Sequence, residues 1–230
     1  GRVHLKPEGG YGGASFTPPS APVTRALVGA CVLVQIAATI GGAAFSDTLE
    51  RHAALVPARF IGAVPTLPGD VPAALTLLTS LFLHAGWIHL ALNLTFLAWV
   101  GKNVEIEIGR GRFVVLYVLS GIVGGLLQVA VAPHSTESVV GASGAIAGVF
   151  GAYAVLFARS RVKARRVLGV NVSAATITAL WYAATWIGLQ LLTAVAFNTG
   201  QGGIAIWTHI GGFIVGLLFA QPFVRRGVAE

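Results

Sequence analysis

The sequence has few charged residues. Asp, Glu, Lys and Arg make up 10% of its 230 residues, whereas hydrophobic residues make up 55% and the mean hydropathy is +0.80. A soluble domain has about 25% charged residues, because it needs them to cover a surface that faces water. The scarcity of charge therefore excludes an ordinary water-soluble domain and indicates a membrane protein.

Cysteine is nearly absent as well. The single Cys31 lies within an apolar run, and one thiol provides neither a disulfide framework nor a metal-ligand pattern. The net charge of +7 does not indicate nucleic-acid binding, because the cations occur in short clusters between apolar stretches, as expected of membrane topology signals. We therefore expect no cofactor, no metal ion and no nucleic-acid partner.

The sequence is rich in apolar stretches of membrane-spanning length. A helix needs about 20 apolar residues to cross the hydrocarbon core of a bilayer. The sequence therefore predicts an all-α, polytopic membrane protein with a bundle of six transmembrane helices over residues 25–224, a mobile cytoplasmic tail at 1–24 and a short cytoplasmic tail at 225–230. The six stretches are 26–45, 75–100, 113–132, 139–158, 174–197 and 204–223.

The distribution of cations predicts the orientation of this bundle. With six spans both termini lie on one side, and of the 15 Lys and Arg residues only Arg51 and Arg59 fall on the other side. Cytoplasmic loops carry the excess of Lys and Arg, so we predict cytoplasmic termini in an inner (cytoplasmic) membrane. The long outer loop at 46–74 contains several prolines and is expected to pack on the membrane face as short helices.

A few polar side chains interrupt the spans, where such groups are energetically costly and often functional. They are His84, His89 and Asn93 in the second stretch, Ser143 in the fourth and His209 in the sixth. His89 and Asn93 are four residues apart and share a helix face, whereas His84 is nine residues from Asn93 and falls on the opposite face of a continuous helix. We therefore predict that His84 is structural and ties the helix start to the first outer loop.

The other four side chains have complementary chemistry. Spans two, four and six run in the same direction, so Ser143, His209, His89 and Asn93 can meet in the outer half of the membrane. A serine hydroxyl needs a base to become a nucleophile, and His209 is the only ionisable side chain in its span. A developing oxyanion needs fixed donors, and Asn93, His89 and the backbone N–H of Ser143 are candidates for them.

Small residues surround the serine and recur in the sixth stretch. Gly141 and Gly144 flank Ser143 closely and leave clearance for a substrate backbone. Two pairs of glycines are four residues apart, Gly144/Gly148 and Gly212/Gly216. Such spacing is typical of helices that pack closely in membranes, and we interpret both pairs mainly as helix-packing positions.

Three other interpretations compete with a serine hydrolase. A transporter needs buried charges or broken helices in paired halves, and the six stretches contain no Asp, Lys or Arg. A haem or metal protein would use His84, His89 and His209, but the helix-face argument separates His84 from the others and no carboxylate or cysteine joins the set. The third interpretation is a protein that keeps the fold but only binds membrane partners.

The motifs resemble those of the rhomboid family of intramembrane serine proteases. The similarity comprises HAGWIHLALN and GKNVE in and after the second stretch, GASG opening the fourth and HIGGFIVG in the sixth, within residues 76–216. It implies a six-helix rhomboid-like bundle with a Ser143–His209 dyad and oxyanion donors at His89, Asn93 and the Ser143 N–H. It also implies single-span membrane proteins as substrates, cleaved in or near their transmembrane segment in the lipid bilayer.

The same resemblance assigns roles to the surroundings of the site. Glu105 and His84 are implied to be structural, and the fifth span with the loop after it to form a lateral gate or cap. Ala147 departs from the family pattern, in which a Tyr or Phe packs against the histidine ring. Either Trp207 or an aromatic residue of the fifth span replaces that support, or His209 is held less firmly, which keeps a weak or inactive rhomboid-like binding subunit as the alternative.

Overall fold

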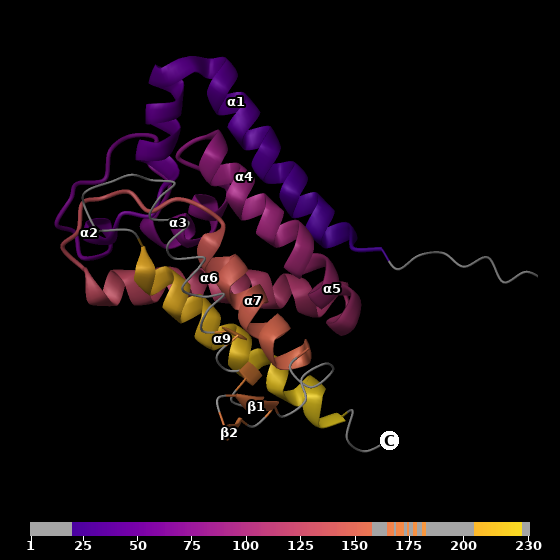
Figure 1. Cartoon of the computed structure of the whole chain (residues 1–230). Coiled ribbons are helices and arrows are strands. Elements are labelled where there is room, and N and C mark those ends of the chain that lie inside the picture. Colours follow the sequence, from indigo (N-terminus) through magenta and orange to yellow (C-terminus); the bar gives the residue numbers. More distant parts are fainter. Residues whose placement is uncertain are drawn as a thin grey trace, which may run out of the picture.

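The computed structural model is a helical bundle with one short hairpin (Figure 1). It describes residues 20–157, 165–167, 169–172, 174, 177–178, 181–182 and 205–226. The helices labelled in Figure 1 are α1 (Pro22–Ala53), α2 (Pro57–Phe60), α3 (Ala73–Thr79), α4 (Trp87–Phe96), α5 (Lys102–Ile108), α6 (Arg110–Val131), α7 (Ser143–Phe157) and α9 (Ile206–Arg226). Strands β1 (Arg165–Val167) and β2 (Val170–Val172) pair in antiparallel fashion.

The all-α membrane class predicted from the sequence is confirmed. Three described helices are long and apolar enough to cross a bilayer, namely α1, α6 and the Ile206–Phe223 part of α9. A bent pair, Ala73–Phe82 with Trp87–Ile108, makes a fourth span when it is counted as one. α7 is apolar but has only 15 residues, and most of the predicted stretch 174–197 lies outside the described residues, so the number six is not established.

Helix α1 is longer than the predicted stretch 26–45 and is bent. It begins at Pro22, whose fixed φ and missing N–H suit the first turn of a helix. At Gly42 the backbone adopts φ 79° and ψ 179°, which is accessible to glycine and breaks the helix into two arms. The second arm folds back at the top of Figure 1 and takes up the first residues of the segment predicted as an outer loop.

The second apolar stretch is two pieces and not the single helix that the sequence suggested. α3 continues into a 3₁₀ turn, Ser80–Phe82, and this piece meets the helix that begins at Trp87 at an angle of 84°. Leu83 is extended at the start of the break. Beyond α4 the helix passes through a π-helical stretch, Leu97–Gly101, into α5.

Helices α7 and α9 touch backbone to backbone. A Cβ atom built on Gly212 would lie 2.0 Å from the carbonyl oxygen of Gly144, and one on Gly216 would lie 1.9 Å from that of Gly148. No side chain larger than hydrogen fits at these positions, which is the geometry that small residues allow in membrane bundles. We call these four residues the glycine seam.

Polar contacts join the start of α1 to α5 and define one end of the bundle, the Glu105 end. The Glu105 carboxylate accepts hydrogen bonds from the N–H of Val23 at 2.9 Å, the N–H of Thr24 at 2.7 Å and the Thr24 hydroxyl at 2.8 Å. It therefore supplies acceptors to first-turn donors that have no partner within the helix. At the same end the Arg112 guanidinium lies 5.2 Å from the ring centre of Phe223.

The opposite end, which we call the loop end, contains residues 54–72 and 132–142. Leu55 and Val139 exchange two backbone hydrogen bonds, of 3.1 and 2.8 Å, so the loop after α1 pairs with the segment that leads into α7. The short helix α2 lies in the first loop, as expected there. In Figure 1 this end lies to the left, away from the start of α1 and the end of α9.

A charged cluster fastens the first loop to the end of α1. The Asp70 carboxylate lies 2.7 Å from Nδ1 of His52 and 3.5 Å from the Arg59 guanidinium, which also donates to the carbonyl of Val71 at 2.7 Å. The hydrogen bond from the Leu67 N–H is the largest of the effects that hold the pKa of Asp70 below its usual value, and the hydrogen bond from His52 is the second. The ionised carboxylate is therefore the form that stabilises this loop.

Candidate active site

Ser143 and His209 lie in direct contact. Ser143 is the first residue of α7 and His209 lies in the first turn of α9, and the glycine seam brings these two helix starts together. The Ser143 Oγ is 2.8 Å from Nε2 of His209. His209 is 1% exposed, whereas Ser143 is partly exposed, so the hydroxyl is accessible while the ring is enclosed.

The start of α9 is fixed from the side of α6. The N–H groups of Thr208 and His209 both donate to the carbonyl of Ala205, at 2.9 and 3.4 Å. A Cβ on Gly124 of α6 would lie 2.4 Å from the carbonyl oxygen of Thr208, so this backbone also approaches a glycine. The position of the His209 ring is therefore set by backbone packing on two neighbouring helices.

Ala147 stands where the family pattern has an aromatic residue against the histidine ring, and Trp207 is one predicted replacement for it. Ala147 is completely buried on α7, and the Trp207 side chain is 38% exposed. The predicted fifth stretch, which was the other source of an aromatic residue and of the gate or cap, lies largely outside the described residues. The support of the His209 ring by an aromatic residue thus stays a prediction.

Gly141 holds the segment that precedes Ser143 against the second span. Its φ is 117°, which favours glycine, and its N–H donates to the carbonyl of Ser80 at 2.9 Å. A Cβ built on Gly141 would lie 2.7 Å from Cε1 of His89, so the imidazole packs directly on this glycine. The space that the missing side chain of Gly141 leaves is filled by the ring of His89. The sequence did not identify His89 as a neighbour of Gly141.

His84 contacts the same segment, and the helix-face argument for it is wrong. That argument assumed a continuous helix, but α4 begins at Trp87 and His84 lies in the break before it. Nε2 of His84 accepts a hydrogen bond from the N–H of Ala142 at 3.4 Å, and its ring meets that of His89 edge to face at 5.1 Å. Its hydrogen bond therefore reaches the residue before Ser143 and not the first outer loop.

His89 and Asn93 share one buried face of α4, as their spacing indicated. Nδ1 of His89 accepts from the N–H of Ala85 at 3.3 Å, so the neutral ring carries its proton on Nε2. The Asn93 amide donates to the carbonyl of His89 at 2.9 Å with one of its two hydrogens. Both groups are thus donors of the kind that an oxyanion requires.

The start of α7 provides backbone donors. Its first helical hydrogen bond runs from the N–H of Ile146 to the carbonyl of Ala142, at 2.9 Å. The N–H groups of the first turn have no partner within a helix and form the positive end of its dipole. The Ser143 N–H is one of them, and it lies on the same residue as the hydroxyl.

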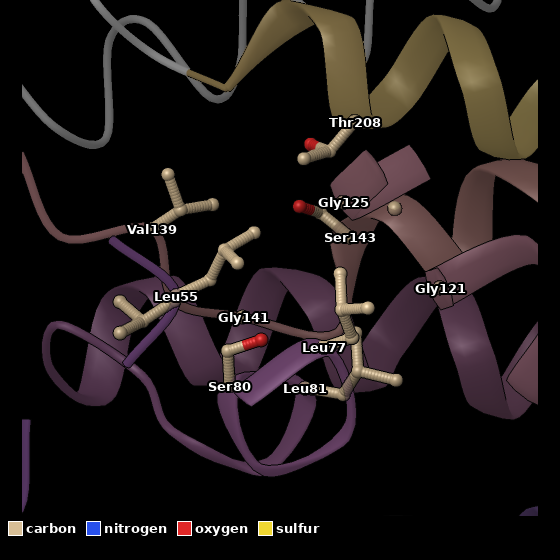
Figure 2. A pocket seen from close by; sticks show the side chains of 12 residues that line it. Leu55, Leu77, Ser80, Leu81, Gly121, Gly125, Val139, Gly141, Ser143 and Thr208 are labelled. Carbon is tan, nitrogen blue, oxygen red and sulfur yellow. The ribbon is translucent and has the colours of Figure 1, made fainter. Parts of the chain in front are cut away.

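Figure 2 shows the hollow beside Ser143, which we call the Ser143 hollow. The Ser143 hydroxyl points into it, between Val139 and Leu55 on one side and Thr208 on the other. The space measures about 310 Å³ with the part that is open to its surroundings. Its lining residues are Leu55, Leu77, Ser80, Leu81, Gly121, Gly125, Val139, Val140, Gly141, Ser143, Gly144 and Thr208.

The histidines were also candidates for a metal site. Among the residues that the structure describes, no group of three or more His, Cys, Asp or Glu side chains is placed to hold a metal ion. The arrangement of Ser143 with His209 instead has the two parts that nucleophilic catalysis requires, a hydroxyl and a base within hydrogen-bond distance.

Comparison with known proteins identifies one family. The family model described as Rhomboid domain matches residues 72–226. The Rhomboid protease GluP of Bacillus subtilis (strain 168) is 34% identical over 144 residues, 63% of this chain, and RHOMBOID-like protein 4 of Arabidopsis thaliana is 32% identical over 154 residues, 65% of this chain. Inactive rhomboid protein 1 of Papio anubis is 30% identical over 169 residues, 71% of this chain.

These relatives are longer than the present chain. The matched part covers 25% of GluP, 34% of RHOMBOID-like protein 4 and 17% of Inactive rhomboid protein 1. The similarity therefore concerns the membrane domain that the matched residues form. Relatives named as proteases and relatives named as inactive are both among the matches.

Proposed function

Since the chain belongs to the rhomboid family, which its domain model matches over residues 72–226, we propose that it is an intramembrane serine protease. In this proposal Ser143 is the nucleophile and His209 is the general base. The observation that supports it is the 2.8 Å distance between the Ser143 Oγ and Nε2 of His209. Family membership alone is not sufficient support, because inactive rhomboid proteins match the chain as well.

The proposed acylation step uses the groups around Ser143. The hydroxyl donates its hydrogen to Nε2 of His209 and attacks the substrate carbonyl carbon while the proton moves to the ring. The Ser143 N–H, His89 Nε2–H and the Asn93 amide are the proposed donors to the oxyanion. His209 then returns the proton to the leaving amine, the C–N bond breaks, and the acyl group stays on Ser143 as an ester.

The proposed substrates are single-span membrane proteins, cleaved in or near their transmembrane segment. The apolar exterior of the bundle keeps the site within a bilayer, and the partial exposure of Ser143 leaves its hydroxyl accessible. We also propose an inner (cytoplasmic) membrane location with the Glu105 end on the cytoplasmic side. Lys102, Arg110 and Arg112 lie at this end, in agreement with the excess of cations in cytoplasmic loops.

Covalent labelling and cleavage test this function. A fluorophosphonate probe should label the wild-type protein in detergent, and a single-span model substrate should be cleaved. Ser143→Ala and His209→Ala should each lower cleavage by at least about a thousandfold without loss of folding. Ser138→Ala, an exposed serine in the preceding loop, is the matched control and should behave as wild type. Cleavage that persists in either dyad variant would rule out this mechanism.

A second candidate function is a rhomboid-like protein that binds membrane partners without cleaving them. Two observations favour it, namely Ala147 in place of the family's aromatic residue and the match to Inactive rhomboid protein 1. A folded wild-type protein that is neither labelled nor able to cleave, but that retains a membrane partner equally well with Ser143→Ala, would support this function over the protease.

A further inference from the structure

The structure contains a second hollow, next to the one at Ser143. It measures about 280 Å³ with the part that is open to the surroundings, and it lies between the two arms of α1, the break before α4 and the segment that leads into α7. We call it the α1 hollow. Its lining residues are Val34, Gln35, Ala38, Ser46, Leu49, Glu50, Leu83, His84 and Val140.

The α1 hollow is polar although it lies in an apolar helix bundle. Gln35, on the first arm of α1, is only 8% exposed, and Ser46 and Glu50 come from the second arm. A buried amide in a membrane helix is costly unless it forms hydrogen bonds. Water that enters from the open side of the hollow can supply them, because an ordered water forms two to four hydrogen bonds in a polar site.

The bend in α1 creates this space and connects it to the surface. The positive φ at Gly42 turns the second arm back over the first, so that Ser46 and Glu50 come to line the same hollow as Gln35. Glu50 is exposed, which places a carboxylate at the mouth of the hollow. The lining thus combines an exposed carboxylate, the buried amide of Gln35 and the imidazole of His84.

Only one residue, Val140, lines both hollows as the structure describes them. Its neighbours are fixed, since Val139 pairs with Leu55 through two hydrogen bonds and the N–H of Gly141 donates to Ser80. The Val140 side chain is itself only partly buried and packs against the cluster of Ala53, Ala54 and Leu83. A rotation about its χ1 is therefore the smallest movement that changes the passage between the hollows.

From this arrangement we infer that the α1 hollow delivers the water that hydrolyses the acyl-enzyme, and that Val140 controls its passage to Ser143. The inference rests on the proposed protease function. The water oxygen attacks the ester carbon on Ser143 and gives a proton to Nε2 of His209. The C–O bond to Ser143 then breaks, His209 returns the proton to the serine oxygen, and a carboxylic acid leaves. Water reaches the site from the α1 side and does not compete with a substrate helix for entry.

Acylation and deacylation can be measured separately with an activated aryl ester, whose burst of phenol reports acylation and whose steady rate reports hydrolysis of the ester. Val140→Phe should lower the steady rate about tenfold or more, and by a larger factor than the burst, because Val140 lines both hollows. Mass spectrometry should show the acylated protein accumulating. Val140→Ala, the matched control that widens the passage, should have a steady rate equal to or above that of wild type.

Gln35→Leu provides a second test far from the dyad in sequence, for the case that Val140→Phe does not fold. It should lower the steady rate with the burst unchanged. If Val140→Phe and Gln35→Leu leave both phases unchanged, or lower both phases equally, the α1 route is wrong. If wild-type protein is not labelled, or if Ser143→Ala is labelled equally well, it is the proposed protease function that has failed.

Discussion

The glycine seam and the broken second span contribute to the same site in opposite ways. Along the seam, the backbones of α7 and α9 touch where Gly212 and Gly216 meet the carbonyl oxygens of Gly144 and Gly148, and no side chain fits at Gly212 or Gly216. The second span bends by 84° and reaches the site through polar side chains. The seam positions the serine and the histidine of the proposed dyad, whereas the second span positions the candidate oxyanion donors.

This difference shows how the fold sets the distance between two helices and how it sets the directions of hydrogen-bond donors. A distance between two helices is set best by backbone contact, because hydrogen atoms in place of side chains allow only one separation. The candidate oxyanion donors must point toward the site from different directions, and a break in a helix allows this. The two regions meet at residues 141–142, which contact both His84 and His89. Four changes test how independent these regions are.

The largest effect is expected from breaking the seam. Gly216→Ala would place a Cβ 1.9 Å from the carbonyl oxygen of Gly148, so the helices must separate. We expect a loss of at least about 3 kcal/mol in the free energy of unfolding, together with all activity. Thermal unfolding in detergent measures this. Gly29→Ala, whose Cβ meets nothing within 4 Å, is the control and should keep wild-type stability.

The next effect concerns the junction between the two regions. Gly141→Ala combines a φ of 117° with a Cβ 2.7 Å from His89, so we expect about a hundredfold loss of kcat with a smaller loss of stability, of about 1–2 kcal/mol. Gly62→Ala is the matched control, since Gly62 has φ 71° but open space around it, and it should lose stability without losing kcat. Equal kcat losses in both variants would mean that the junction does not transmit to the site.

A moderate effect is expected at the Glu105 end, which lies in the second span about three helical turns beyond Asn93. Glu105→Gln removes the charge that accepts three hydrogen bonds from the start of α1, so stability should fall by about 2 kcal/mol. The folded protein should keep its kcat, because the seam, the break and the candidate oxyanion donors of the second span are unchanged. Glu107→Gln changes an exposed carboxylate on the same helix and should have no effect on unfolding. A kcat loss for Glu105→Gln alone would show that this end is coupled to the site.

The smallest effect is expected at the charged cluster of the loop end. The folded-state pKa of Asp70 lies below its ordinary value of 3.8, so its contribution is complete above that pH and is lost as the pH falls through the lowered value. Thermal unfolding of wild type and Asp70→Asn should therefore differ by a constant amount at neutral pH, and the two curves should converge on acidification. A difference that grows toward acid pH would contradict this sign.

The fold class and the meeting of Ser143 with His209 could be anticipated from residues alone. Apolar stretch length indicates membrane helices, and a serine and a histidine at corresponding depths of two such stretches have few other partners. The structure places their side chains 2.8 Å apart, whereas their catalytic role stays a prediction that the labelling experiment addresses.

The break in the second span could not be inferred from hydropathy. Residues 75–100 are apolar almost throughout, and the period of a helix continues through His84 and Gly86 without interruption. The available signal was the polar His84 two residues before Gly86, which we interpreted within a continuous helix. Contacts such as Asp70 with His52, or Glu105 with Thr24, depend on tertiary packing of residues far apart in sequence, and sequence spacing carries no record of them.

The π-helical stretch at Leu97–Gly101 makes the chain unusually sensitive to length at this point. Such a turn accommodates one residue more than an α-helix would, so removing a single residue there should restore regular winding. Everything beyond it would then turn by about 100° relative to α4. The carboxylate of Glu105 would rotate away from the first turn of α1 while the imidazoles of the second span stayed in place. One codon thus separates a capped first helix from one whose opening amides have lost their acceptor.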